Sequence, residues 1–292
     1  MNRFVSLLVC SCALIFASCE SDLSGTDSGT SGTSGTGGSE TSGTNVSFKR
    51  PDALIGDQPA DDSYVRLVVQ LKSVKEGGPV YNYANTINLN ALSSVEIPEI
   101  AEGEYNVYAW ADSFSSQKDS PSFYNVENLS NIFFGGDGYG SVASGAKTAY
   151  YVSQENVKID GSRLDLDMRL PHGGYRILMT DLYSVLGDKG AGCKAVVTYA
   201  GFLPSGFNVY TQRVVDSVPG ASYSMSLPEI TAGNAICVAE DIVLCGQNTS
   251  QVSVSVKILD KDGEVCWMSD QIMIPLENGK INEQNILIQP KE

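Results

Sequence analysis

Glu102-Gly103-Glu104-Tyr105-Asn106-Val107-Tyr108-Ala109-Trp110-Ala111-Asp112 is the stretch of this chain that decides its fold. Successive side chains of a β-strand point to opposite faces, so the alternation predicts a strand with Tyr105, Val107 and Ala109 on one face. The Glu102-Gly103 pair in front of it predicts a turn. The stretch therefore indicates one strand of a packed sheet.

Similar strand signals recur along the chain, whereas helix signals are scarce. The further expected strands lie at residues 64–71, 95–97, 164–170, 175–179, 252–258, 265–267, 272–276 and 285–288. Asp262-Gly263 separates two of these runs and predicts a hairpin. Only residues 181–186 suggest a short helix. Many short strands joined by turns predict an all-β fold made of two β-sandwiches.

The N-terminus has the pattern of an export signal. Arg3 precedes an apolar run at residues 4–18, which is too short to span a bilayer and ends in the small residues Ala17 and Ser18. Cys19 follows, and the segment resembles a bacterial lipoprotein signal. That resemblance implies removal of residues 1–18 and acylation of Cys19, with palmitate among the lipids. An ordinary signal peptide with an incidental cysteine is the alternative.

A tether follows the cysteine. Residues 19–47 are dominated by Gly, Ser and Thr, with Ser-Gly-Thr repeated between Ser24 and Thr44. Such a composition buries nothing and predicts a solvated coil. About 25 residues of this kind give a mean extension of roughly 25–30 Å. We interpret the segment as a stalk; a neutral spacer without a height requirement would have the same flexibility.

Composition excludes several classes of function. The formal charge of −15 argues against nucleic acid and against anionic headgroups as partners. Past the signal, the cysteines are Cys193, Cys237, Cys245 and Cys266, which can form up to two disulfides or remain buried thiols. None of them forms a Cys-x-x-Cys pair, and His172 is the single histidine, so a metal or thiol-redox site is not expected. No cofactor is predicted.

Several motifs in order carry a resemblance to a family. They are residues 102–112, Arg169-Leu170-Pro171 before Tyr175-Arg176-Ile177, residues 199–208 and residues 274–280. Across roughly residues 60 to 290, the chain resembles the fimbrillin-like lipoproteins of the Bacteroidales. The resemblance implies two tandem transthyretin-like β-sandwiches, here 48–169 and 170–292, on an exported lipoprotein at the outer membrane, with the cell surface as its expected location.

The resemblance also implies a way of assembling. Such subunits join by adding an extended segment to a sheet edge of another subunit, and an arginine-specific protease first removes an N-terminal strand from shaft subunits. Lys49-Arg50 is the candidate site here, but Pro51 makes cleavage after Arg50 poor. We therefore expect an anchor or accessory subunit that begins at Cys19 and meets fimbrial subunits or surface ligands. A solvated domain edge is the alternative interpretation of Lys49-Arg50.

Catalytic motifs are weak, and we predict no enzyme. A Ser-His-Asp triad would depend on His172, which we expect in a structural turn, Pro171-His172-Gly173-Gly174. Asp165 and Asp167 share a strand face with arginines beside them, as expected of a charge-balanced edge. The glycine-rich residues 133–140 lack the Lys-Ser/Thr of a phosphate loop, so we expect a mobile loop. Asp260-Lys261-Asp262-Gly263 has the opening of a calcium-binding loop but lacks the remaining ligands, and the predicted hairpin explains these residues.

Aromatic residues in loop-like stretches support a second hypothesis. They are Tyr81, Tyr83, Phe114, Phe123, Tyr124, Phe133, Phe134, Tyr139, Tyr150 and Tyr151. Aromatic faces with polar neighbours suit sugars, so the alternative function is a glycan-binding surface lipoprotein of a nutrient-uptake system. Equally, these side chains can close the ends of a sandwich. Asp216-Ser217-Val218 resembles the O-glycosylation signal of these bacteria, with Ser217 as the acceptor.

Overall fold

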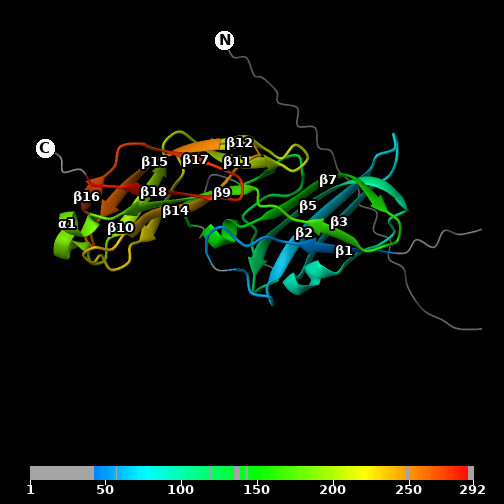
Figure 1. The fold of residues 1–292 in the computed structure, drawn as a ribbon, viewed down its shortest axis with the longest axis horizontal. Coiled ribbons are helices and arrows are strands. Elements are labelled where there is room, and N and C mark those ends of the chain that lie inside the picture. The colour runs from blue at the N-terminus through cyan, green and yellow to red at the C-terminus, as the bar shows by residue number, and fades with distance from the viewer. Residues whose placement is uncertain are drawn as a thin grey trace, which may run out of the picture. The chain divides into compact units, whose positions relative to one another are not determined.

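The computed structural model describes residues 43–56, 58–118, 120–134, 139–141, 144–247 and 250–288. Residues Thr41–Glu292 form one compact unit. The predictions for Cys19, for the signal and for the tether before residue 43 lie outside the described residues. The all-β fold built of sandwiches is confirmed (Figure 1).

The N-terminal half of the unit is a sandwich of two sheets (Figure 1). In sheet order, the larger sheet contains β3 (Val80–Asn88), β2 (Tyr64–Ser73), β5 (Gly103–Ser115) and β7 (Tyr150–Ile159). The smaller sheet contains β4 (Val95–Ile97), β1 (Thr44–Lys49) and β8 (Leu164–Asp167), and the 3-10 turn η1 (Leu89–Ser93) precedes β4. Every neighbouring pair is antiparallel except β1 and β8, which are parallel.

The alternation read from the sequence sets which face is buried. Tyr105, Val107 and Ala109 of β5 lie in the core, as predicted, together with Leu67 and Leu71 of β2. The other face of β2 carries Arg66 and Val68. One sheet therefore has a face for the core and a second face for other contacts.

Strand β1 corrects one expected boundary. Residues 44–47 were expected in the tether but form most of β1. Thr44 pairs with Ile97 of β4, and Val46 pairs with Leu164 of β8. Val46 and Phe48 are buried in the core. The composition did not indicate this strand, because its apolar residues are few and directly follow the Ser-Gly-Thr repeats.

The C-terminal half contains the remaining sheets (Figure 1). One sheet has the order β13 (Ser222–Ser226), β10 (Lys194–Tyr199), β15 (Ser250–Leu259) and β16 (Val265–Met268), with β17 (Ile272–Leu276) also paired to β15. The second contains β14 (Ile236–Leu244), β9 (His172–Met179) and β18 (Ile281–Ile286). The third contains β12 (Arg213–Pro219), β11 (Phe202–Asn208) and β6 (Ile132–Phe133). The helical pieces are α1 (Leu182–Leu186), η2 (Tyr139–Ser141), η3 (Ser144–Lys147) and η4 (Gly187–Gly190).

Turn chemistry agrees with the predictions at the end of the chain. Strands β15 and β16 pair antiparallel around Gly263, whose φ of 88° is in the region that favours glycine. The expected short helix is α1. The last strand starts at Ile281, earlier than expected, and pairs parallel with β9. It is thus a strand of its own sandwich.

The expected turn at Pro171-His172-Gly173-Gly174 is wrong. His172, Gly173 and Gly174 are the first residues of β9, and all three are buried. A Cβ atom on Gly173 would lie 2.9 Å from the carbonyl oxygen of Glu277. Gly173 therefore allows a close approach of the backbone between β17 and β18, which is a common reason for glycine in a strand.

A segment of the N-terminal half packs into the C-terminal core. Strand β6 pairs with β11 through Gly206–Phe133 and Phe207–Ile132. The core cluster of the C-terminal half includes Trp110, Tyr124 and Tyr139. Long-range pairing, which no local sequence pattern reveals, joins the two halves.

Candidate functional site

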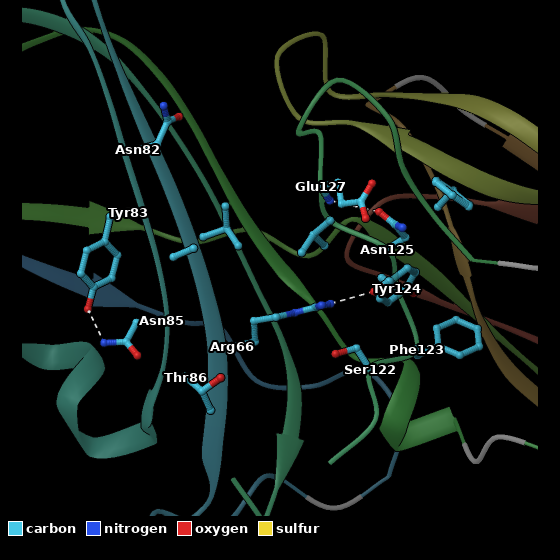
Figure 2. Close-up of a pocket in the computed structure, with 14 residues that line it drawn as sticks. Arg66, Asn82, Tyr83, Asn85, Thr86, Ser122, Phe123, Tyr124, Asn125 and Glu127 are labelled. Atoms are coloured by element: carbon cyan, nitrogen blue, oxygen red, sulfur yellow. Dashed lines mark hydrogen bonds between the residues drawn. The ribbon is translucent and has the colours of Figure 1, made fainter. Parts of the chain in front are cut away.

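A groove lies over the outward face of β2 and β3 (Figure 2). Arg66 is paired with Thr86, and Gln70 with Asn82, so these side chains share the face opposite the core. Val68 and Ala84 form the apolar part of the same wall. The cavity has a volume of about 1000 Å³.

Residues 122–127 form the facing wall of the groove (Figure 2). The amide of Asn125 donates to the carbonyl of Phe133 at 2.7 Å, and the amide of Phe133 donates back at 3.2 Å. Since Phe133 also pairs with Gly206 of β11, this wall is fixed to the third sheet.

Arg66 links the two walls. Its Nε and Nη2 atoms donate to both oxygens of Asp112 at 2.8 and 2.6 Å, a bidentate pair. Nη2 also donates to the carbonyl of Tyr124 at 2.8 Å, drawn as the dashed line between Arg66 and Tyr124 in Figure 2. Asp112 is 1% exposed, and burial raises the pKa of its carboxyl while Arg66 opposes that shift. The positive charge of Arg66 is therefore balanced by Asp112, and its hydrogen bond to Tyr124 fixes the wall formed by residues 122–127.

The expected set of exposed aromatic loops is largely buried. Tyr124, Phe134, Tyr139, Tyr150 and Tyr151 are core residues, so the alternative that these side chains fill the interior is right for half of the set. Phe123 and Phe133 remain in the lining of the groove. The rings of Phe123 and Phe134 stack with centroids 4.9 Å apart.

A second polar site is buried between the halves. Asp241 of β14 accepts from Nζ of Lys147 at 2.9 Å, from the hydroxyl of Tyr139 at 2.7 Å and from that of Tyr199 at 2.9 Å. The Lys147 nitrogen lies 3.6 Å from the Tyr139 ring centroid. Burial lowers the pKa of Lys147, and Asp241 opposes this shift. The network holds η2 and η3 against β14.

His172 belongs to the same region. Its Nε2 lies 2.8 Å from the hydroxyl of Tyr124, which donates to the carbonyl of Lys147 at 2.9 Å. Nε2 must therefore carry the proton, and among the described residues Nδ1 has no hydrogen-bond partner. Burial, and secondly the charge of Lys147, lower the pKa of His172 to about 3. The histidine is neutral and structural.

Other residues singled out from the sequence are spread over the surface. Asp165 pairs with Arg163 at 3.3 Å and both are exposed, as expected of a charge-balanced edge. Ser217 is exposed on β12, so its glycosylation stays a prediction. The Asp260 carboxylate accepts from the amides of Asp262 and Glu264, which confirms the hairpin interpretation. Arg50 is partly exposed at the end of β1.

Two other kinds of site are absent from the described residues. Within these ranges, no cluster of His, Cys, Asp or Glu side chains has the arrangement of a metal site. No described helix has the length and apolarity needed to cross a membrane. Cys193 and Cys245 are buried, whereas Cys237 and Cys266 are partly buried. Burial raises the pKa of the Cys237 and Cys245 thiols. Residues 135–138 of the glycine-rich stretch lie outside the described part.

A family model covers most of the chain. The sequence model of the "Family of unknown function (DUF6562)" matches residues 44–283, and the chain belongs to this family. No curated protein matches the chain.

Alignments with solved structures have low sequence identity and TM-scores below 0.5. A candidate adhesin from Bacteroides ovatus aligns with a TM-score of 0.48 and 13% identity, over 87% of this chain and 94% of that one. The fimbrial anchor protein Mfa2 from Porphyromonas gingivalis aligns with a TM-score of 0.45 and 14% identity, over 78% and 81%. A candidate polysaccharide-binding protein from Bacteroides thetaiotaomicron gives 0.46 and 15%, over 77% and 78%.

The sequence did not reveal the ion pairs Arg66–Asp112 and Lys147–Asp241. Arg66 and Asp112 are 46 positions apart, and Lys147 and Asp241 are 94 apart. In the sequence, Asp112 marks only the end of an expected strand. Charged residues are rarely buried unless paired, but nothing local marks which ones will be.

Proposed function

We propose that the protein is a non-enzymatic, lipid-anchored surface protein of the anchor or accessory type. Acylated Cys19 holds it to the outer membrane, and the tether displays the two sandwiches, residues 48–169 and 170–292, outside the cell. There it joins fimbrial subunits by strand addition or contacts surface ligands. The proposal combines the export signal with the geometry of the first strand.

One observation carries the proposal: β1, the first strand after the tether, is built into the core. It is the central strand of its sheet, paired with β4 on one side and β8 on the other. Val46 and Phe48 are buried at 1% and 4% exposure. A lipid at Cys19 would therefore be covalently continuous with a strand that the sandwich holds firmly.

The position of Arg50 supports retention of this strand. Cleavage after Arg50 would separate β1 from the rest of the chain, because β1 ends at Lys49. Pro51 hinders such cleavage. A chain that keeps β1 keeps its anchor, whereas a chain that loses it opens a groove for a donor strand.

Metabolic labelling with a palmitate analogue tests the anchor. We expect label in the native protein and none in Cys19→Ala, with Cys266→Ala as the control that keeps its label. Label that persists in Cys19→Ala contradicts the anchor. Mass spectrometry of the native N-terminus is the second measurement. A terminus at Cys19 supports the proposal, and a terminus at Pro51 replaces it with a processed shaft subunit.

A further inference from the structure

We propose that the groove between β2–β3 and residues 122–127 binds a neutral glycan. This inference rests on the proposed surface function and assigns its ligand class. It makes one face of the first sandwich the adhesive surface.

The groove offers hydrogen-bonding groups that the fold does not use. In the described ranges, the side chains of Thr86, Ser122 and Glu127 make no hydrogen bond to protein. Asn82 accepts from Gln70 through its Oδ1 atom at 2.9 Å, which leaves the amide hydrogens of Asn82 available. Hydroxyls, amides and a carboxylate are the groups that pair with sugar hydroxyls.

Aromatic surface lies beside these polar groups. Phe133 is 38% exposed and offers a ring face, whereas Phe123 is half-buried and packs against the core of the C-terminal half, with its ring stacked on Phe134. The C–H faces of a pyranose ring are apolar and stack on such rings. An apolar surface with a few convergent polar groups is the usual composition of a ligand site.

Charge selects neutral over anionic sugars. The cation in the groove, Arg66, is already bound by both oxygens of Asp112. The Glu127 carboxylate stands without a counter-ion in the described part of the lining, and the chain carries a net charge of −15. Sialylated or sulfated glycans would meet repulsion without a free partner.

Both walls are fixed before a ligand arrives. Strands β2 and β3 pair along nine residues, from Tyr64–Asn88 to Lys72–Val80. The facing wall is held by the Asn125–Phe133 bridge and by Arg66. A rigid site loses little conformational entropy on binding.

The test is a glycan array probed with the purified full chain, followed by titration of the best neutral oligosaccharide. We expect neutral glycans to bind and sialylated or sulfated ones not to bind. Phe133→Ala should weaken binding at least tenfold, and Asn82→Ala severalfold. The matched control is Phe202→Ala, an aromatic residue 70% exposed on β11 outside the groove, which should leave affinity unchanged.

Three results would overturn the inference: no neutral glycan binds, anionic glycans bind better, or the groove variants retain full affinity. Arg66 is not a useful test position, since its removal leaves buried Asp112 unpaired. Labelling of Cys19 in the same cells keeps the two proposals separate. Label on Cys19 without glycan binding contradicts only the groove proposal, and glycan binding without label contradicts only the anchor proposal.

Discussion

At the scale of single residues, burial turns two titratable groups into structural ones. His172 is 1% exposed and hydrogen-bonds Tyr124, so it stays neutral. Asp241 is fully buried, and its charge is balanced by Lys147 and by tyrosine hydroxyls. Both lie where the segment before β7 meets β9 and β14. Each therefore leads to a prediction about stability that would not apply to a surface residue.

Stability should fall in acid because of His172. Its pKa is about 3 in the fold against an ordinary 6.5. Well above pH 6.5, His172 is neutral in the folded and the unfolded state and does not affect stability. Below that pH, His172 is protonated in the unfolded chain but stays neutral in the folded protein, so acid favours unfolding. The loss is about 1.4 kcal/mol per pH unit, or about 2.7 kcal/mol at pH 4.5.

Urea unfolding of the wild type and of His172→Phe across pH 4 to 8 measures this effect. The difference in unfolding free energy should be constant above about pH 7 and shrink in acid, because Phe cannot titrate. A difference that does not change with pH contradicts the assignment of a neutral, buried His172.

The buried pair Lys147–Asp241 predicts an asymmetric mutant series. Asp241→Asn leaves the Lys147 charge buried without a counter-ion and should cost about 3–5 kcal/mol of unfolding free energy. Lys147→Met should cost less, because Asp241 keeps the Tyr139 and Tyr199 hydroxyls and the amide of Ile242.

Denaturant unfolding checks the order of the series. Adding Lys147→Met to Asp241→Asn should recover part of the loss, since no uncompensated charge remains. The control is Lys261→Met in the exposed pair with Asp262, which should change stability by less than about 0.5 kcal/mol. Equal losses in Lys147→Met and Lys261→Met would mean that the buried pair does not matter.

At the scale of elements, we propose that retention of β1 decides whether the folded part keeps its anchor. It follows the tether, precedes Arg50 and lies between β4 and β8. Its contribution comes from Val46 and Phe48 in the core and from main-chain pairing on both sides. Loss of β1 would therefore remove core volume and leave two strands unpaired.

Phe48→Ala should destabilise the protein by about 3–5 kcal/mol, because the buried ring is replaced by a cavity. Asn45→Ala in the same strand is the control, since Asn45 is exposed, and its effect should stay below about 0.5 kcal/mol. Chemical unfolding measures both. Similar values for the two variants would show that β1 is not part of the stable core.

At the scale of the whole molecule, the segment between β5 and β7 ties the halves together. Its strand β6 pairs with β11, and its residues Tyr139 and Lys147 bind Asp241. Its residue Tyr124 hydrogen-bonds His172. The core cluster of the C-terminal half is thus completed by residues from before position 170. We propose two sandwiches divided near Arg169, with this segment shared between them.

The shared segment predicts how fragments behave. Residues 172–292 alone should bind ANS and unfold without cooperativity, because Asp241 loses Lys147 and the core loses Trp110, Tyr124 and Tyr139. A fusion that restores residues 120–149 should bind less ANS and unfold more sharply. Cooperative unfolding of residues 172–292 alone, without ANS binding, would show that the segment is dispensable.

The sequence by itself indicated about half of the strands, those with clear alternation or turn signals, and the faces that they bury. Alternation in β5, Asp262-Gly263 in the hairpin and the run at residues 252–258 are local signals, because side-chain direction in a strand has a period of two. Tertiary structure decided the rest. The groove, the role of Gly173 and the burial of Asp241, His172 and β1 all come from contacts between distant residues. Such contacts depend on how sheets pack, which no short stretch of sequence encodes.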